Sequence, residues 1–512
     1  MHLLVHHAHA AQAQVDTAPP PQSPGLHRTA HEELALVIAW SAREPHRVGE
    51  LARCVADVPL ILGRAPDSGG NEQTLSFSPH GYGGSSVELR NRAGSELLGE
   101  ALSRRQLALR SDGCTLTVRN IGRCPMWVNG HLSGQAKVVA GDTIHLQQQL
   151  LLLCVQRASL PLQNRQYPAA RQQTFGQPDS DGIVGESAAM WQLREQIATC
   201  AQTSGHVLVI GASGSGKELV AQAIHRMSAR SQKGLVAENI AAMPASLAAA
   251  LLFGNRRNFP NPGMEERAGL IGLAEGGTLF LDEIGDMTAE VQPVFLRVLE
   301  RGGEYLRLGD EAHPRKANVR VIGATNHPER LRIELRRRFH HEIVVPDLQQ
   351  RTEDIPLLVN HLLRLRAREH AGALKYFCAG APRIDPRLVE QLLRHRYSTH
   401  VSELSFLLQQ AIEHSPDDVL LPIARATALT RVSLVDAAAL VPLPAQSVSP
   451  PSAAPPSLRS LPSAEEAARA LQTAGGCVVR TAMQLGITRH QLNRLIRKNG
   501  LAVERTSKRR AD

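Results

Sequence analysis

Short apolar runs separated by turn-forming residues fill the first part of the chain, residues 31–158. Runs rich in Leu, Val and Ile, bounded by Gly, Asn, Asp and Ser, are typical of strands in a β-sandwich. We expect strands at Leu34–Trp40, Pro59–Leu62, Gln106–Arg110, Thr115–Val118, Met126–Val128, Thr143–Leu146 and Leu150–Val155. The pattern therefore predicts an N-terminal β-sandwich.

In the rest of the chain, hydrophobic residues recur at other spacings. Residues 181–345 alternate strand-like and helical patterns, which is typical of a parallel sheet covered by helices. Residues 346–435 have helical patterns only, so we expect a helical lid on this α/β block. Residues 463–512 are predicted to hold a short set of helices with a turn at Gly486–Thr488. The expected fold is multidomain: a β-sandwich, an α/β block with a lid, and an all-α block.

Segments without periodicity separate these blocks. We expect residues 1–30 to be a disordered tail and residues 159–180 to be a polar linker. Residues 436–462 are a second predicted linker, because seven prolines lie among the 21 residues 442–462 and such segments are semi-rigid.

Cysteine content and the length of apolar runs indicate the cellular compartment in which we expect the protein. The seven cysteines are scattered and form no Cys-x-x-Cys pair, which favours a reducing cytoplasm over a disulfide framework or a zinc site. Apolar runs fall far short of the roughly 20 residues that span a membrane, so no membrane partner is expected.

A glycine-rich turn follows the apolar strand Val207–Ile210 and precedes a helical pattern. The turn and the start of the helix are Gly211, Ala212, Ser213, Gly214, Ser215, Gly216, Lys217 and Glu218. Backbone N–H groups at a helix start bind phosphate, and a lysine at this spacing adds a positive charge. The motif predicts a nucleotide site, although Glu218 stands where Ser or Thr normally binds Mg²⁺.

Two further predicted strands end in polar residues. The run Thr278–Leu281 precedes Asp282 and Glu283, and another apolar run precedes Asn326. Asp282 is expected to hold Mg²⁺, and Glu283 to polarise the water that attacks ATP. Asn326 is a candidate sensor of the terminal phosphate. These residues predict ATP and Mg²⁺ as ligands.

These motifs resemble the AAA+ domain of bacterial enhancer-binding proteins, the sigma-54 activator family. The segments GASGSGKE, LAEGGTLFLDEIGDM, VFLRVLERGGEYLRLG and VRVIGATN carry the resemblance, which extends over residues 181–435. In that family the phosphate loop ends in Lys-Glu, which accounts for Glu218. The resemblance implies that Asn239 is a switch residue that contacts Glu283.

The resemblance also implies contacts between subunits. Arg332 and Arg338 match two arginine fingers that reach the nucleotide of a neighbouring subunit, which implies a homo-oligomer, usually a hexameric ring. The alternative is a solvated basic helix face, since Arg336 and Arg337 lie between them.

Two stretches depart from the family pattern. The family loop Gly-Ala-Phe-Thr-Gly-Ala grips the sigma factor, but residues 254–263 keep only Phe259 as an apolar tip and add Pro260 and Pro262, which restrict the backbone. Ser402 replaces the sensor arginine of the lid. We therefore expect slow hydrolysis, and sigma-54 RNA polymerase stays an open possibility as a partner.

The first block resembles a forkhead-associated (FHA) domain, a β-sandwich that binds phosphothreonine proteins. The matching segments are Gly63-Arg64, Leu102–Arg105, Val128–Gly130 and Ala140–Asp142. The resemblance implies that Arg64 and Ser103 hold the phosphate and that Arg105 assists, since Arg forms charge-assisted bonds to phosphate. Gln106 replaces the usual His, and the family's loop Asn is missing from residues 123–126. The alternative is a sandwich kept for protein contact.

The last block resembles a Fis-type helix-turn-helix, with DNA as the partner. The candidate DNA-binding residues are Arg489, His490, Asn493, Arg494, Arg497 and Lys498. Residues 464–512 hold ten Lys and Arg against four Asp and Glu, so most of the chain's net charge of +9 lies here. A basic segment fits a nucleic-acid partner.

Together the blocks predict a cytoplasmic transcription regulator with an FHA input, an ATP-binding AAA+ module and a DNA-binding end. The alternative is a non-motor DNA-binding adaptor in which the nucleotide only controls assembly.

Overall fold

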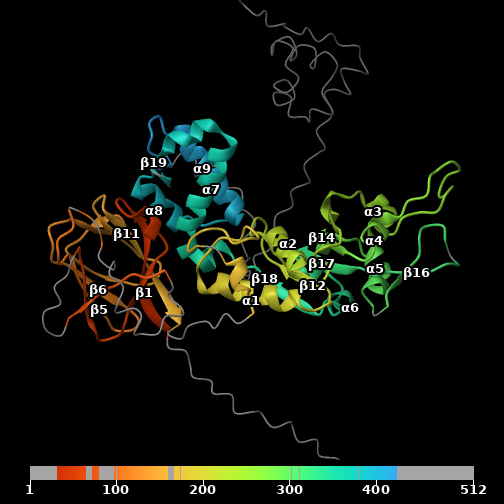
Figure 1. The fold of residues 1–512 in the computed structure, drawn as a ribbon, viewed down its shortest axis with the longest axis horizontal. Coiled ribbons are helices and arrows are strands. Elements are labelled where there is room, and N and C mark those ends of the chain that lie inside the picture. The colour runs from red at the N-terminus through yellow and green to blue at the C-terminus, as the bar shows by residue number, and fades with distance from the viewer. Residues whose placement is uncertain are drawn as a thin grey trace, which may run out of the picture. The chain divides into compact units, whose positions relative to one another are not determined.

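The computed structural model describes residues 32–64, 72–79, 97, 99, 101–158, 166–172, 174–300, 302–310, 312–378 and 380–423. They fold into a two-sheet β-domain, an α/β subdomain and a helical lid (Figure 1). The predicted tail, the Pro-rich linker and the helix-turn-helix with all its candidate DNA-binding residues lie outside the described residues.

The N-terminal block is a sandwich of two sheets, in the orders β2-β1-β11-β10-β7-β8 and β4-β3-β5-β6-β9. Its strands are β1 Glu32–Ser41, β2 Leu51–Cys54, β3 Pro59–Leu62, β4 Gln73–Thr74, β5 Leu107–Ser111, β6 Leu116–Asn120, β7 Met126–Val128, β8 His131–Leu132, β9 Gln135–Val138, β10 Thr143–Leu146 and β11 Leu150–Ala158. All seven predicted strands are confirmed. The sequence pattern missed β2, β4, β8 and β9, which are only two to four residues long.

The α/β subdomain contains a five-stranded parallel sheet in the order β13-β14-β17-β12-β18. The strands are β12 Val207–Ile210, β13 Leu235–Asn239, β14 Thr278–Asp282, β17 Arg320–Thr325 and β18 His341–Val344. The helices are α1 Ala188–Ala201, α2 Lys217–Met227, α3 Ala245–Phe253, α4 Gly269–Leu273, α5 Val291–Leu299 and α6 Ile333–Arg336.

Helices cover both faces of this sheet. Leu279 and Leu281 of β14 pack into one apolar cluster with α3 to α6, whereas Phe280 between them packs into another with α1 and α2. A strand that is buried on both sides is apolar along most of its length, which explains the hydrophobic run Leu279–Leu281.

The lid follows the sheet. It contains the 3-10 segment η7 Leu348–Asp354 and the helices α7 Ile355–Glu369, α8 Pro386–Arg394 and α9 His400–His414. A short hairpin, β19 Phe377–Cys378 with β20 Ala381–Pro382, interrupts the helices that the sequence predicted there. The lid and the sandwich share one apolar cluster, so they pack directly against each other.

The predicted linker between the sandwich and the α/β subdomain is partly packed. Tyr167 is 4% exposed, and its hydroxyl donates to Asp179 over 2.8 Å. Asp179 in turn pairs with Arg194 of α1. Polar side chains of the predicted linker therefore hold this segment against α1.

No helix in the described part of the chain combines the length and the hydrophobicity of a membrane span.

The Arg194–Asp179 pair provides a stability test, because both side chains are 4% exposed and their atoms lie 3.0 Å apart. Arg194→Met leaves a buried carboxylate without its cation and should cost about 3–5 kcal/mol of unfolding free energy. Arg226→Met is the control: that side chain is 47% exposed, and its loss should cost about 1 kcal/mol or less. Urea titrations followed by circular dichroism measure both, and equal losses would contradict the assignment.

Candidate functional site

The glycine-rich turn between β12 and α2 forms a phosphate-binding loop that touches the lid. Gly214 and Gly216 adopt positive φ angles of 75° and 105°. A Cβ atom on Gly214 would lie 2.4 Å from the Thr399 carbonyl oxygen and 2.7 Å from Ser402 Oγ. The Gly214 carbonyl accepts a hydrogen bond from the Val401 N–H at 3.1 Å. Only glycine fits this contact between the loop and the start of α9.

Lys217, the first residue of α2, connects the loop to the acidic end of β14. Its side chain is 7% exposed, and Nζ donates to the Gly211 carbonyl at 3.1 Å and to Glu283 Oε1 at 3.3 Å. A buried ammonium group needs such acceptors, because an unpaired charge is costly away from water. The predicted lysine and the predicted carboxylate therefore lie together.

Asp282 and Asn239 end neighbouring parallel strands in register. The Asn239 side-chain amide donates to Asp282 Oδ2 over 3.2 Å. The family resemblance implied a contact of Asn239 with Glu283, and the structure differs. Glu283 has a left-handed backbone (φ 48°) and turns its carboxylate toward Lys217 and the Asn326 N–H, which lies 3.3 Å from Oε2.

Burial and neighbouring charges shift the pKa of the Asp282 carboxyl group. Burial raises the pKa of Asp282, and the neighbouring Glu283 carboxylate raises it further, against hydrogen bonding and Lys217. A cation bound at Asp282 would relieve this cost. The residues thus fit the predicted Mg²⁺ ligand, with Asp282 as the donor.

A cavity of about 520 Å³ opens beside the phosphate loop, between the α/β subdomain and the lid. It is lined by Gly182, Ile183, Val184, Met190, Leu193, Gly214, Ser215, Gly216, Leu219, Val220, Val345, Arg351, Leu358, His361, Leu362, Leu365, Val401, Ser402 and Ser405. A largely apolar cavity of this size suits a planar base with a few polar contacts. Burial lowers the pKa of His361, with Arg368 and Arg364 adding to the effect, so its ring is neutral at neutral pH.

Sequence reasoning missed most of this cavity. Its walls come from helices far apart in the chain, and apolar lid positions such as Leu358 and Leu362 have the pattern of ordinary core residues. It also missed Arg351, which is 3% exposed and donates from Nη2 to the Ser215 carbonyl at 3.3 Å.

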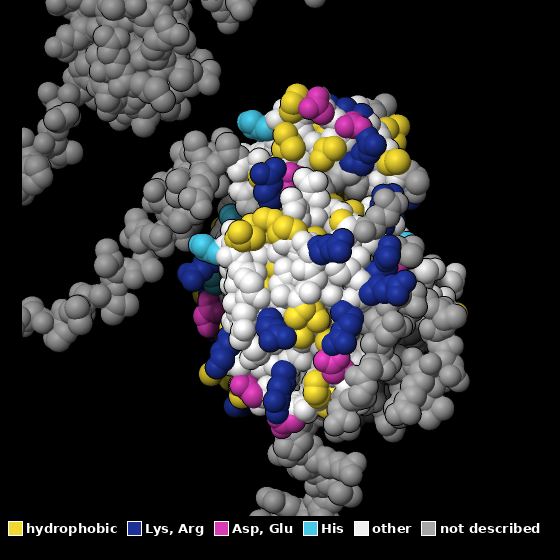
Figure 2. Space-filling model, turned by 90° about the vertical axis from the view of Figure 1, so that its left-hand side faces the viewer, with side chains coloured by type: hydrophobic (Ala, Val, Ile, Leu, Met, Phe, Trp, Pro, Cys, Tyr) yellow, Lys and Arg dark blue, Asp and Glu magenta, His cyan; other side chains and the backbone are white. Residues whose placement is uncertain are grey.

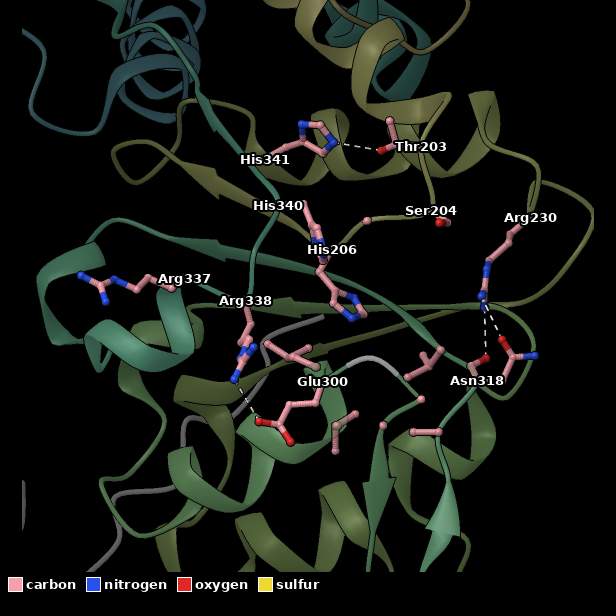
Figure 3. A pocket seen from close by; sticks show the side chains of 17 residues that line it. Thr203, Ser204, His206, Arg230, Glu300, Asn318, Arg337, Arg338, His340 and His341 are labelled. Carbon is pink, nitrogen blue, oxygen red and sulfur yellow. Dashed lines mark hydrogen bonds and ion pairs between the residues drawn. The ribbon is translucent and has the colours of Figure 1, made fainter. Parts of the chain in front are cut away.

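The two candidate arginine fingers lie away from the chain's own phosphate loop. Arg332 is exposed; its backbone N–H donates to Gln292 Oε1 at 2.8 Å, and its carbonyl accepts the Arg336 N–H at 3.0 Å. Arg338 forms a half-exposed ion pair with Glu300 at 3.1 Å, inside a second cavity of about 800 Å³ (Figure 3). That cavity shares no lining residue with the first one.

The altered family loop is held closed. Asn255 Nδ2 donates to the carbonyls of Arg256, Phe259 and Glu265 over 3.0, 3.2 and 3.0 Å. The Phe259 ring packs against Gly309 and stays 39% exposed. Arg256 lies 3.7 Å from Asp310. The loop is therefore attached to the segment that contains β15 Glu304–Tyr305 and β16 Arg315–Lys316.

The candidate phosphopeptide residues lie on neighbouring loops of the sandwich. The Arg64 N–H donates to the Ser103 carbonyl at 3.1 Å, and Ser103 Oγ accepts the Arg123 N–H at 2.9 Å. Arg105 pairs with Glu72, so its charge is already balanced. Figure 2 shows basic side chains spread over this end of the molecule with acidic ones among them, rather than a single basic patch.

Gln106 connects these loops through side-chain hydrogen bonds. It is fully buried, accepts the Ser103 N–H at 3.0 Å, and donates to Asn120 Oδ1 at 2.7 Å and to the Cys124 carbonyl at 2.8 Å. The residue that replaces the expected His therefore holds Ser103 in place.

Residues 183–349 match the family model described as the sigma-54 interaction domain. This part of the chain is therefore similar to a sigma-54 interaction domain. The match confirms the resemblance that the motifs of this block carry. The matched residues include the phosphate loop, Asp282 with the following Glu283, and the two candidate arginine fingers.

Relatives of known name align over the same part of the chain. The anaerobic nitric oxide reductase transcription regulator NorR of Aeromonas hydrophila is 37% identical over 242 residues, 46% of each chain. The DNA-binding transcriptional regulator NtrC of Bradyrhizobium is 38% identical over 253 residues, 48% of this chain and 51% of that one. The chain thus spans about half the length of these relatives. A crystal structure of NtrX from Brucella abortus in complex with ATP is 27% identical, with a TM-score of 0.41, over 64% of this chain and 70% of that one.

The contact between the phosphate loop and the lid can be tested with two glycines of similar backbone. Gly214 and Gly276 have φ angles of 75° and 73°, but only Gly214 has atoms within 4 Å of a built Cβ. Each Gly→Ala change should cost about 1–2 kcal/mol for the left-handed backbone. Gly214→Ala should lower the thermal midpoint more, because its methyl group displaces the start of α9. Equal midpoints for the two variants would rule out the contact.

Proposed function

We propose that the protein is a transcription regulator of the sigma-54 activator type that binds ATP with Mg²⁺ in its central block. One observation carries the proposal: the buried Lys217 ammonium lies between the Gly211 carbonyl and the Glu283 carboxylate, beside a base-sized cavity. The match to the sigma-54 interaction domain family supports the same function.

The Lys217–Glu283 contact suggests how binding prepares hydrolysis. A nucleotide phosphate is a stronger acceptor for Lys217 than one carboxylate oxygen, since it brings more negative charge. Lys217 would turn to the phosphate, and Glu283 would become available to polarise the attacking water. Asp282 would hold Mg²⁺, which supplies charge neutralisation at the phosphates, while Asn239 orients the Asp282 carboxylate.

The hydrolysis step also needs positive charge from outside the chain's own loop. Ser402 brings no cation to the cavity, and the lining residue Arg351 already donates to the Ser215 carbonyl. Arg332 and Arg338 do not line the cavity, and Arg338 is paired with Glu300. We propose that both arginines act on the nucleotide of a neighbouring copy, in a homo-oligomer such as a hexameric ring. An isolated chain would then hydrolyse ATP slowly.

The flanking blocks would supply input and output. Arg64 and Ser103 lie on adjacent loops, which supports binding of a phosphothreonine protein. The basic end of the chain, residues 463–512, would bind DNA through its predicted helix-turn-helix, as the names of the relatives suggest. ATP and chromosomal DNA are both present in the bacterial cytoplasm, so we propose that location.

A second candidate function follows from the closed loop around Phe259. A protein that remodels sigma-54 RNA polymerase needs a mobile apolar tip, whereas Asn255 and Gly309 hold this one down. We infer that the chain regulates transcription with weak remodelling or none. In that form it is a DNA-binding adaptor in which the nucleotide controls assembly.

Nucleotide binding is tested by Lys217→Ala in the full chain, with Lys233→Ala as the control because Lys233 is exposed and lies outside the loop. Lys217→Ala should weaken binding of a fluorescent ATP analogue at least about tenfold, since a charge-assisted bond contributes about 1.5–3 kcal/mol. Lys233→Ala should bind like the wild type. An unchanged affinity in Lys217→Ala would refute the phosphate-loop assignment.

The second candidate is tested by ATP-dependent open-complex formation at a sigma-54 promoter with purified components. We expect little activity and no further loss in Phe259→Ala. Phe406→Ala is the control, because Phe406 is also 39% exposed but lies on the lid. Strong activation that depends on Phe259 and not on Phe406 would establish the remodelling function instead.

A further inference from the structure

The sandwich is attached to the lid by polar contacts as well as by the shared apolar cluster. Thr143 Oγ1 of β10 donates to Glu390 of α8 over 2.6 Å. Arg394, one turn later on α8, donates to the Asn129 carbonyl at 3.0 Å and to Asn129 Oδ1 at 2.9 Å. These contacts fix the sandwich to a helix that contributes nothing to the cavity beside the phosphate loop.

A second contact is made at a different part of the lid. Arg157, near the end of β11, pairs with Glu353 of η7 at 2.8 Å, and their side chains are 8% and 12% exposed. Burial raises the pKa of Glu353, while Arg157 acts in the opposite direction. Arg157 is thus what favours a charged carboxylate at this buried position.

Glu353 lies in a short turn whose neighbours contact the candidate nucleotide site. Two residues before it, Arg351 donates to the Ser215 carbonyl of the phosphate loop at 3.3 Å. One residue after it, Asp354 Oδ1 accepts the N–H groups of Glu186 and Ser187 at 2.7 and 2.9 Å. Those N–H groups follow Gly182–Val184, which form a wall of the cavity. The turn 351–354 therefore touches the sandwich, the phosphate loop and the cavity wall within four residues.

We propose that Arg157 of the sandwich is a positioning residue for the nucleotide site and acts through Glu353 on the turn 351–354. This inference rests on the proposed ATP binding. When Arg157 holds Glu353, the turn keeps Arg351 on the phosphate loop and Asp354 on the cavity wall. The N-terminal sandwich is then part of the nucleotide-binding unit, and a ligand that displaces the sandwich changes nucleotide affinity.

The test measures the dissociation constant of a fluorescent ATP analogue with Mg²⁺ in the full chain. Arg157→Met should weaken binding about fivefold or more, the lower range of couplings between distant sites. Arg157→Lys, which keeps the charge, should recover part of the loss. Arg53→Met removes an arginine that pairs with Glu33 within the sandwich and should leave affinity unchanged.

Two further variants separate positioning from loss of docking or of fold. Thr143→Val weakens the docking contact at α8 without touching the turn 351–354, so affinity should stay at the wild-type value. In the double variant Arg157→Met/Glu353→Gln, the loss should be no larger than in the worse single variant, because both changes break one pair. Additive losses, or an equal loss in Thr143→Val, would overturn the role of Arg157.

The outcome also distinguishes this inference from the function on which it rests. If the wild type binds the analogue and Lys217→Ala does not, an unchanged affinity in Arg157→Met refutes the positioning role alone. If the wild type fails to bind, ATP binding and the positioning role both fail.

Discussion

The buried ammonium of Lys217 is the constraint on which the central block depends. At 7% exposure it needs a negative partner, and Glu283 provides one at 3.3 Å. An unpaired buried charge would cost several kcal/mol, so the loop after β12 and the end of β14 must stay close together. The parallel sheet makes this possible, because the carboxyl ends of its strands meet at one edge. Asn239, Asp282 and Asn326 reach the same edge for the same reason.

The sequence predicted much of this arrangement, because local patterns encode it. Strand runs, the glycine spacing and Lys217 are local signals, and the seven sandwich strands and the phosphate loop were found from them. What it missed depends on contacts between distant segments. Examples are the cavity walls, the hydrogen bond from Arg351 to the Ser215 carbonyl and the Arg157–Glu353 ion pair. Each joins residues far apart in the chain, and no hydrophobic periodicity in the sequence relates them. The contact of Asn239 with Asp282 instead of Glu283 follows from strand register and a left-handed Glu283, which residue spacing does not reveal.

The lid contacts both the α/β subdomain and the sandwich. It closes the cavity through α7 and α9, meets the phosphate loop at Gly214, and packs on the sandwich through one apolar cluster. The α/β subdomain and its lid depart from the family pattern at Ser402, which lines the cavity, and at the closed loop around Phe259. We propose that both changes reduce motor action, while Lys217, Asp282 and Glu283 keep the positions expected for nucleotide binding. A regulator that uses nucleotide binding more than nucleotide turnover fits this distribution.

Hydrogen–deuterium exchange of the full chain, with and without a non-hydrolysable ATP analogue and Mg²⁺, tests this account most directly. We expect slower exchange in the phosphate loop 211–218, at the cavity wall 182–187 and in the turn 348–357, because all three form or hold the proposed nucleotide site. Protection that is absent from the phosphate loop, or confined to residues outside these three segments, would contradict it.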